Sequence, residues 1–596
     1  MSEQARFCAT LVDEWVRHGA AHAVVAPGSR STPLALALAG RPEVALHVVL
    51  DERSAAFTAL GLGRATGVPA ILLCTSGTAA VGFHAAVVEA GLSLVPMLVC
   101  TADRPPELHQ VGAPQAIEQV GLYGTAPVWA VDIDPQAWST ASWRSLASRA
   151  ALAAATGPVH LNLRFREPLL GDPEGDLPAA RPGARPWHQE VVVEGAEGAT
   201  GLRRLGPCGA MGAGGERREQ PDQAQAARRP GFGGPGLDLA DSRRVLVVAG
   251  EGCDRRWAEV AAAGPWPVLA DPLSGWRVPG PATVAGFDAI VRHLPANGDL
   301  APDLVLHLGR PPASRALGEW FDRDGARHVL VDQAGRWLDP ARRADVHVTA
   351  APDALLRRWQ EELPPPEDGW LTRWQRAEAS AQGAISTVLG RHPEVTEPGL
   401  ARDLTAHLPV GAALVVSSSM PIRDVEWFAE PRLGLELHAN RGANGIDGVT
   451  STALGVALAG AGRPTACLLG DLAFLHDSGA LAGLAARPCA LTLVVIDNHG
   501  GGIFSFLPQA TQLPPDRFEQ LFGTPQPVDL KALAAAHALP VTEVSAAADL
   551  APALAEATAA GGVRILLART DRAANVAIHQ ELAAAVGAAL GEGSSS

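Results

Sequence analysis

The fold is decided by residues 468–505, which read LLGDLAFLHDSGALAGLAARPCALTLVVIDNHGGGIFS. The stretch opens with an apolar run that ends at Gly470-Asp471, and its second run, Leu491 to Ile496, contains only leucine, threonine and other β-branched residues. Such a run is typical of a strand buried in a parallel sheet. A helical segment is expected between the two runs, around 481–485. Ligands of open parallel sheets bind beyond the carboxyl ends of the strands. The sequence therefore predicts that Asp471 and Asn498 face one crevice.

The residues that follow these two strands suit a metal ion bound to a phosphate. The side chains of Asp471 and Asn498 and the backbone carbonyl of Gly500 offer oxygen atoms, which are the ligands that Mg²⁺ prefers. Glycines at 500–502 let the backbone approach a phosphate closely. The alternative is that Asp471 and Asn498 are ordinary turn residues. Their position at the ends of consecutive strands favours the metal site.

Length and composition exclude several classes of protein. A chain of 596 residues predicts three or four domains, at about 150 residues each. The net charge of −15 argues against nucleic-acid binding. No run of 18 apolar residues and no signal peptide are recognisable, so we expect no membrane segment. The seven cysteines are scattered without a Cys-x-x-Cys pair, which indicates a reducing, cytoplasmic environment.

Two regions of the chain alternate helical and strand-like segments. In residues 1–175 we expect strands at 23–26, 46–50, 71–74 and 95–100, and we expect the second of these to be buried. Residues 395–585 repeat the scheme, since Ala59-Leu60-Gly61 before one strand corresponds to Ala453-Leu454-Gly455 before another. The alternation predicts an α/β fold with doubly wound parallel sheets. The correspondence indicates a duplicated domain.

A third α/β domain is expected at 241–365, with strands at 244–249, 303–308 and 328–331. Few polar residues converge there, so we interpret it as a structural or accessory domain. Residues 176–240 are expected to be a linker. Its part from 194 to 239 is rich in Gly, Ala, Arg and Pro and lacks apolar periodicity. Because roughly 45 unstructured residues inside a compact enzyme are unusual, translation out of frame is a second interpretation.

The metal motif resembles the diphosphate-anchoring motif of thiamine diphosphate enzymes, because Asn498 lies 27 positions after Asp471. Leu472 stands where that family's motif has a glycine. The resemblance implies the thiamine diphosphate-binding fold for the three doubly wound domains. It also implies thiamine diphosphate as the cofactor, with Mg²⁺ or Mn²⁺ held by Asp471, Asn498 and the carbonyl of Gly500.

The same resemblance implies where the reactive ring of the cofactor is held. Glu52 follows the strand expected at 46–50 and precedes a helix start. Thiamine diphosphate enzymes carry a catalytic Glu in this setting, where it shares a proton with N1′ of the aminopyrimidine. The alternative is an acid that complements the helix dipole. The resemblance also assigns Ile446 as apolar support for the cofactor and counts Gly470 and Ser419 among the cofactor-binding residues.

Longer motifs resemble one branch of these enzymes, the 2-succinyl-5-enolpyruvyl-6-hydroxy-3-cyclohexene-1-carboxylate synthase family of menaquinone biosynthesis. They are PGSRSTPL at 27–34, ADRPPEL at 102–108 and NRGANGIDG at 440–448. That family decarboxylates 2-oxoglutarate on the cofactor and adds the resulting carbanion to isochorismate. The resemblance therefore implies a transferase with these two substrates.

Both substrates carry several carboxylates, which match the planar fork of arginine. The substrate-binding residues that the resemblance implies are Ser29, Arg30, Arg104, Gln115, Arg315, Arg423 and Arg441. Ala316 stands where the family has a second basic residue after Arg315. For each arginine, the alternative is a solvated surface residue.

The family's fold implies a homodimer or homotetramer in which Glu52 of one subunit faces Asp471 of another. Two other functions stay open at this point. One is a different thiamine diphosphate-dependent 2-oxoacid decarboxylase or carboligase, against which the arginines and the motifs at 27–34 and 440–448 argue. The other is a non-catalytic homologue that only binds the cofactor, and the presence of Glu52 and Asn498 argues against it.

Overall fold

The computed structural model describes residues 3–171, 176–190, 241–295, 297–323 and 325–593. Most of the expected linker, including its Gly- and Arg-rich part at 194–239 and the question of its reading frame, lies outside these residues. The described residues fall into two compact units: one takes in those up to 190 and from 382 to 589, and the other takes in those from 241 to 381. Among the described helices, none has both the length and the apolar character needed to cross a membrane.

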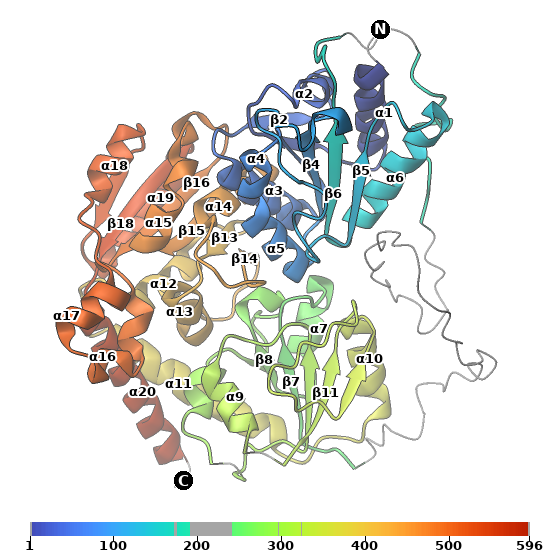
Figure 1. The fold of residues 1–596 in the computed structure, drawn as a ribbon. Coiled ribbons are helices and arrows are strands. Elements are labelled where there is room, and N and C mark those ends of the chain that lie inside the picture. Colours follow the sequence, from blue (N-terminus) through green and yellow to red (C-terminus); the bar gives the residue numbers. More distant parts are fainter. Residues whose placement is uncertain (1–2, 172–175, 191–240, 296, 324, 594–596) are drawn as a thin grey trace. The chain divides into compact units, whose positions relative to one another are not determined.

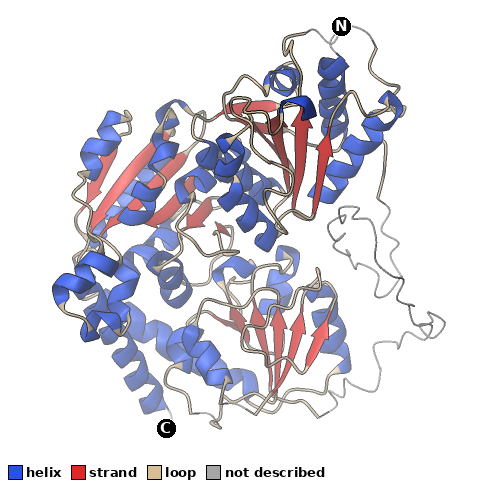
Figure 2. Ribbon diagram, viewed as in Figure 1, coloured by secondary structure: helices blue, strands red, loops and turns tan. Residues whose placement is uncertain are grey.

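The described residues form three six-stranded sheets, and every pair of neighbouring strands is parallel (Figures 1 and 2). Helices flank each sheet, because parallel strands are joined by long crossover connections that usually contain a helix. The predicted α/β class with three doubly wound sheets is therefore confirmed.

The strands of the first sheet are β1 (His22–Val25), β2 (Ala45–Val48), β3 (Ala70–Cys74), β4 (Met97–Asp103), β5 (Trp129–Ile133) and β6 (Pro158–Arg164). Those of the second sheet are β7 (Val245–Ala249), β8 (Val268–Ala270), β9 (Thr283–Val284), β10 (Leu304–Leu308), β11 (Arg327–Val331) and β12 (Val346–Val348). Those of the third are β13 (Ala413–Val416), β14 (Glu436–His438), β15 (Thr465–Gly470), β16 (Leu491–Asp497), β17 (Val541–Val544) and β18 (Val563–Arg569).

The helices of the N-terminal region are α1 (Glu3–Arg17), α2 (Thr32–Ala39), α3 (Glu52–Thr66), α4 (Thr78–Gly82), α5 (His84–Ser93) and α6 (Trp143–Ala154). The second sheet is accompanied by α7 (Ala258–Ala262), α8 (Phe287–Val291), α9 (Arg315–Phe321), α10 (Pro352–Glu362) and α11 (Trp370–Leu389). The C-terminal region holds α12 (Glu397–His407), α13 (Met420–Phe428), α14 (Val449–Ala459), α15 (Asp471–His476), α16 (Gln509–Gln512), α17 (Pro515–Phe518), α18 (Leu530–Ala536), α19 (Leu550–Ala560) and α20 (Arg572–Gly593).

The first and third sheets have the same topology. Their strand orders, β2-β1-β3-β4-β6-β5 and β14-β13-β15-β16-β18-β17, become identical when twelve is subtracted from each number of the second. The second sheet has a different order, β12-β11-β10-β7-β8-β9. The shared order supports the duplication inferred from the repeated Ala-Leu-Gly segments, one of which lies in α3 and the other in α14.

These two helices join the first and third sheets into one unit. The apolar side chains of α3 and α14 belong to a single buried core that also takes in strands of both sheets. The helices approach each other closely because Gly61 and Gly455 meet at their crossing: a Cβ on Gly61 would lie 2.1 Å from the carbonyl oxygen of Thr452. A Cβ on Gly455 would lie equally close to the carbonyl oxygen of Thr58. Glycine is needed at both positions because only hydrogen fits there.

Two local expectations are wrong. Strand β2 is shorter than predicted and is not buried; it is an edge strand, with Val48 half exposed and Leu50 beyond its end 71% exposed. The helix expected around 481–485 is replaced by two short 3₁₀ turns, Ser478–Leu481 and Leu484–Ala486. Gly483 between them takes a left-handed φ of 72°, which interrupts the helical path.

Candidate active site

The two motif strands of the C-terminal region are neighbours, as predicted. Strands β15 and β16 pair in register, with Gly470 opposite Ile496, so the residues after each strand emerge at the same edge of the sheet. Asp471 begins α15, and one of its oxygens, Oδ1, accepts from the backbone N–H of Leu472 at 2.7 Å. The other, Oδ2, accepts from the N–H of Gly500 at 2.8 Å. Burial raises the pKa of Asp471 to about 6.

In the Asn498 side chain, the amide nitrogen has a hydrogen-bond partner and the amide oxygen has none among the described residues. Its Nδ2 donates to Oε1 of Glu397 at 2.8 Å, and Thr570 Oγ1 donates to the same oxygen at 3.0 Å. The Oδ1 atom of Asn498 is buried and has no hydrogen-bond partner among the described residues. Buried polar atoms are rarely left in this state. An oxygen that is ready to accept fits a metal ligand.

The glycines after Asn498 are required by close packing. Gly500 has a φ of 130°, and a Cβ there would lie 1.9 Å from the carbonyl oxygen of Gly523. A Cβ on Gly502 would lie 2.8 Å from Nδ2 of Asn498. A larger residue at 500 would displace backbone and one at 502 would displace the Asn498 side chain, so these glycines hold the predicted phosphate-binding turn in place.

A second group of possible metal ligands lies at the same strand ends. Ligand atoms of Asp471, Asp497 and His499 lie within 4.8 Å of one another. However, Asp497 Oδ1 already contacts Nδ1 of His499 at 3.0 Å, and the His499 side chain is 78% exposed. Asp497 and His499 are not among the predicted site residues, although Asp497 ends the buried strand β16 and His499 lies just after it.

The other predicted residues of the C-terminal region lie on α13 and on the loop before α14. Ser419 caps α13 with a positive φ of 76°, and Nη1 of Arg423 donates to its carbonyl oxygen at 2.6 Å. Ile446 is half-buried and packs against the shared core. Arg441 is half-buried, and no hydrogen bond or ion pair engages its guanidinium among the described residues.

Glu89 of α5 anchors that loop and was missed by the sequence argument. It is only 2% exposed, and its carboxylate accepts from the N–H groups of Gly442 and Ala443 at 2.8 and 2.6 Å. A residue of the N-terminal region therefore fixes the backbone beside Arg441. No local sequence signal indicates this role, because Glu89 sits inside an ordinary helix.

In the N-terminal region, Ser29 and Arg30 lie in the turn after β1. Ser29 is exposed, whereas Arg30 is buried. The Arg30 guanidinium donates to the carbonyl oxygen of Phe165 at 3.1 Å and pairs with Glu167 at 3.1 Å. Its backbone N–H donates to Oγ1 of Thr75 at the end of β3. The partners of Arg30 hold it firmly in position.

Gln115 and Arg104 are brought together in the segment after β4. Nε2 of Gln115 donates to the carbonyl of Ser76 at 2.9 Å, and the guanidinium of Arg104 donates twice to the carbonyl of Pro114. The fully buried Gln119, which the sequence argument missed, accepts from Gly77 N–H at 2.8 Å. The turn after β3 and the segment 104–119 therefore form one connected surface.

Asn162 of β6 is hydrogen-bonded to several residues of that surface and of the strands beside it. Its Nδ2 donates to Asp103 and to Asp132, each at 2.8 Å, and its Oδ1 accepts from Gln119 at 2.8 Å and from Thr101 at 3.0 Å. All four bonding positions of the amide are thus used. Burial raises the pKa of Asp103.

Glu52 is the first residue of α3, so the helix begins slightly earlier than expected. The helix begins there because Asp51 accepts the N–H of Ser54 at 2.9 Å as an N-cap. The next two residues reach the C-terminal region of the same chain: Arg53 donates to the carbonyl of His476, and Ser54 donates to Asp477 at 3.4 Å. The Glu52 side chain makes no hydrogen bond or ion pair with another described residue. Among the described residues, no hydrogen bond or ion pair joins Glu52 to Asp471.

Arg315 lies in the other unit, at the start of α9. Its side chain is 83% exposed and pairs with Glu319 one turn later, at 2.6 Å. An exposed i,i+4 pair of this kind contributes little to stability. Arg315 therefore belongs to a different unit from the other predicted site residues, and its described ion pair is made within its own helix.

Comparison with known proteins shows that the N-terminal and C-terminal regions match two domains of the same class of enzyme. Residues 6–122 match the N-terminal binding domain of thiamine pyrophosphate enzymes, and residues 430–567 match their C-terminal binding domain. The first match contains Glu52 and the second contains Asp471 and Asn498. The chain has the fold and the two cofactor-binding domains of a thiamine pyrophosphate (thiamine diphosphate) enzyme.

Full-length relatives narrow the class to one family. Proteins named 2-succinyl-5-enolpyruvyl-6-hydroxy-3-cyclohexene-1-carboxylate synthase match from Thermobifida fusca (41% identity, 99% of this chain and 100% of that protein) and Chloroflexus aurantiacus (39%, 98% and 96%). The protein of that name from Myxococcus xanthus is 39% identical over 98% of this chain and 97% of its own length. This chain belongs to the 2-succinyl-5-enolpyruvyl-6-hydroxy-3-cyclohexene-1-carboxylate synthase family.

Proposed function

We propose that the chain decarboxylates 2-oxoglutarate and joins the remaining four-carbon unit to isochorismate, which yields 2-succinyl-5-enolpyruvyl-6-hydroxy-3-cyclohexene-1-carboxylate and CO₂ in menaquinone biosynthesis. The observation that carries this proposal is the match of almost the whole chain to synthases of that name. Five described cysteines, Cys8, Cys74, Cys100, Cys467 and Cys489, are buried free thiols, in keeping with a reducing cytoplasm.

Asp471, Asn498 and the carbonyl of Gly500 are proposed to hold Mg²⁺, or Mn²⁺, on the diphosphate of the cofactor. The open Oδ1 of Asn498 and the carboxylate of Asp471 are hard oxygen ligands that suit these ions. The alternative set that includes His499 suits a softer metal. Gly470 is proposed to lie beside the diphosphate, and Ser419 and Ile446 are proposed to contact the rest of the cofactor.

Thiamine diphosphate, when bound, supplies a thiazolium carbon that stabilises the carbanion left by decarboxylation. Glu52 is proposed to hold a proton at N1′ of the aminopyrimidine. Its side chain is suited to this role because no protein group competes for it within the described chain. Asp51 and the contacts of Arg53 and Ser54 fix the helix end from which it projects.

The substrate carboxylates are proposed to bind the basic and polar residues that the family resemblance implies. Arg441 has a guanidinium without a partner among the described residues, so it is free to bind a carboxylate bidentately. The other proposed members are Ser29, Arg30, Arg104, Gln115, Arg315 and Arg423. Arg30 and Arg423 already donate to backbone carbonyls, and these bonds fix the direction in which each guanidinium points.

The complete site is proposed to need two chains, in a homodimer or homotetramer. This proposal rests on the family resemblance and is supported by Glu52, whose side chain makes no hydrogen bond or ion pair with a described residue of its own chain. Analytical ultracentrifugation tests it. An active monomer would contradict the proposal.

The decisive experiment measures 2-oxoglutarate consumption with and without isochorismate, thiamine diphosphate and Mg²⁺. We expect full turnover only with all four present. Glu52→Gln should retain cofactor binding and lose turnover, since the amide cannot share the proton at N1′. Glu43→Gln, at an exposed acid before β2, is the matched control. Normal turnover by Glu52→Gln would refute the assignment.

A further inference from the structure

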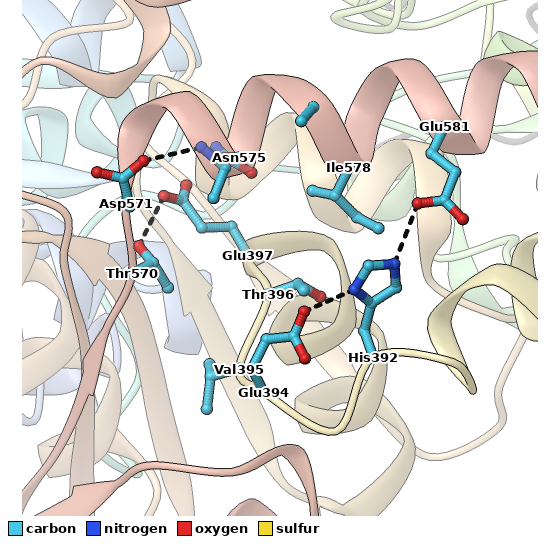
Figure 3. A pocket seen from close by; sticks show the side chains of 12 residues that line it. His392, Glu394, Val395, Thr396, Glu397, Thr570, Asp571, Asn575, Ile578 and Glu581 are labelled. Carbon is cyan, nitrogen blue, oxygen red and sulfur yellow. Dashed lines mark hydrogen bonds and ion pairs between the residues drawn. The ribbon is translucent and has the colours of Figure 1, made fainter.

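A buried carboxyl group lies directly behind the proposed metal ligand Asn498. Glu397 is the first residue of α12 and is only 1% exposed. Its Oε1 accepts from Nδ2 of Asn498 at 2.8 Å and from Oγ1 of Thr570 at 3.0 Å. Figure 3 shows Glu397 directed at Thr570, which precedes α20. The carboxyl therefore links three elements that are distant in sequence.

The contact with Glu397 orients the Asn498 amide. Oε1 of Glu397 acts as an acceptor, since Thr570 donates to it as well, and only the NH₂ group of Asn498 can supply a second donor to that oxygen. The reverse orientation would place Oδ1 of Asn498 against Oε1 of Glu397, two acceptors with no hydrogen between them. The observed orientation turns Oδ1 away from Glu397, and that oxygen has no partner in the described part of the protein.

We propose that Glu397 is a positioning residue, which fixes the Asn498 amide so that its oxygen is presented to the metal ion. The inference rests on the metal-binding role proposed for Asn498. Outer partners of metal ligands orient them in this way in other metal sites, and losing one weakens metal affinity about 10–100-fold.

If Glu397 only stabilised the start of α12, it would need no hydrogen bond to another part of the chain. An acid in the first turn of a helix is favoured by the helix dipole without any bond to a distant residue. Glu397 instead bonds to a residue 101 positions away and to another 173 positions away. Its other side borders a cavity of about 220 Å³, whose rim carries exposed Glu394 and Glu581. Aspartate at position 397 would keep the charge of the side chain but would be too short to reach Asn498.

The test is a set of variants at Glu397 whose metal binding is measured directly. Binding of Mn²⁺ in the presence of thiamine diphosphate is followed by the loss of the free-ion EPR signal, and Mg²⁺ binding by calorimetry. Glu397→Leu should weaken both metals about 10–100-fold. Glu397→Gln keeps a carbonyl oxygen that accepts from Asn498, so it should stay within about threefold of the parent. Turnover at saturating Mg²⁺ should change much less than the Mg²⁺ concentration needed for half activity.

Glu394→Gln is the matched control, because Glu394 borders the same cavity but its described side-chain bond is to His392, at 2.6 Å. It should leave metal affinity unchanged. If Glu397→Leu does not fold, Glu397→Asp tests the same contact and should weaken metal binding in the same direction. Folded Leu or Asp variants with normal metal affinity would overturn the proposal. An equal loss in Glu397→Gln would also overturn it, because charge rather than amide orientation would then be responsible.

Asn498→Ala separates this inference from the function on which it rests. If the Ala variant binds metal normally, the proposed role of Asn498 fails. If the Ala variant loses metal but folded Glu397→Leu does not, only the positioning role of Glu397 fails. Loss in both variants, with retention in Glu397→Gln, supports the positioning role.

Discussion

Replacing Gly61 by alanine should push α3 and α14 apart and disable the enzyme. The new Cβ would lie 2.1 Å from the carbonyl oxygen of Thr452, whereas ordinary contact begins at 3.4 Å. The two backbones must therefore move apart by about 1 Å where they cross. The neighbouring atoms belong to backbone, so no side-chain rotation relieves the overlap. Such overpacking costs about 1–3 kcal/mol or more.

Alanine also has a higher helix propensity than glycine, which opposes this cost by about 1 kcal/mol. Gly383→Ala isolates that gain, because Gly383 is an exposed helical residue of α11 and a Cβ added there would meet no atom within 4 Å. We expect Gly383→Ala to be slightly stabilising and Gly61→Ala to be destabilising. Gly455→Ala, on the facing helix, should resemble Gly61→Ala, since its Cβ would meet Thr58 at the same 2.1 Å.

The activity effect should exceed the stability effect. Glu52 begins the helix that contains Gly61, so a shift of α3 moves the proposed proton-holding group. A displacement of about 1 Å can lower the rate about 100-fold. Calorimetry, hydrogen exchange across α3 and α14, and kcat/KM of the three variants test the prediction. If Gly61→Ala matches Gly383→Ala in all three measurements, the close crossing of the helices does not constrain the site.

Two further predictions concern buried polar groups. Burial raises the pKa of Asp477 from 3.8 to about 6, so the folded state binds the proton of this carboxyl group more tightly than the unfolded state does. The bound proton therefore stabilises the folded protein. This stabilisation is fully present below pH 3.8 and is lost as the pH rises through about 6. Asp477→Asn should flatten the decline of the unfolding midpoint over that window, and a variant profile parallel to that of the parent would contradict this. Asn162→Leu removes the hydrogen bonds that Asn162 makes with Asp103 and Gln119, and it should lower the free energy of unfolding by about 1–3 kcal/mol for each of these groups. Hydrogen exchange in residues 104–119 should become faster. Unchanged exchange there would show that the network does not hold the segment.

Strands buried on both faces could be predicted from the sequence, and with them the edge of the sheet where the site lies. Every residue of β16 is buried, so its apolar run was unambiguous. The edge strand β2 was misjudged, because an apolar run does not reveal whether a neighbouring strand or helix covers it. The turns around Gly483 were misjudged because apolar spacing does not report the left-handed backbone.

The proposed ligands were recognisable, whereas the residues that hold them were not. Asp471 and Asn498 stand at strand ends, where position alone suggests a site. Glu397 and Glu52 both begin helices, where an acid is expected for the helix dipole whatever else it does. Only the fold shows that Glu397 is bonded to Asn498 and that Glu52 is not bonded to any described residue of its own chain.

The N-terminal region of the chain acts on the C-terminal site through structural contacts as well as through the catalytic residue it is proposed to lend to a second subunit. Glu89 holds the backbone beside Arg441, and Ser54 contacts Asp477 just beyond α15. The glycine crossing of α3 and α14 fixes the distance between the two regions. Because these contacts lie within one chain, a single chain can shape its C-terminal site without the proposed second subunit. A monomeric variant should therefore lose turnover while it retains binding of Mn²⁺ with thiamine diphosphate.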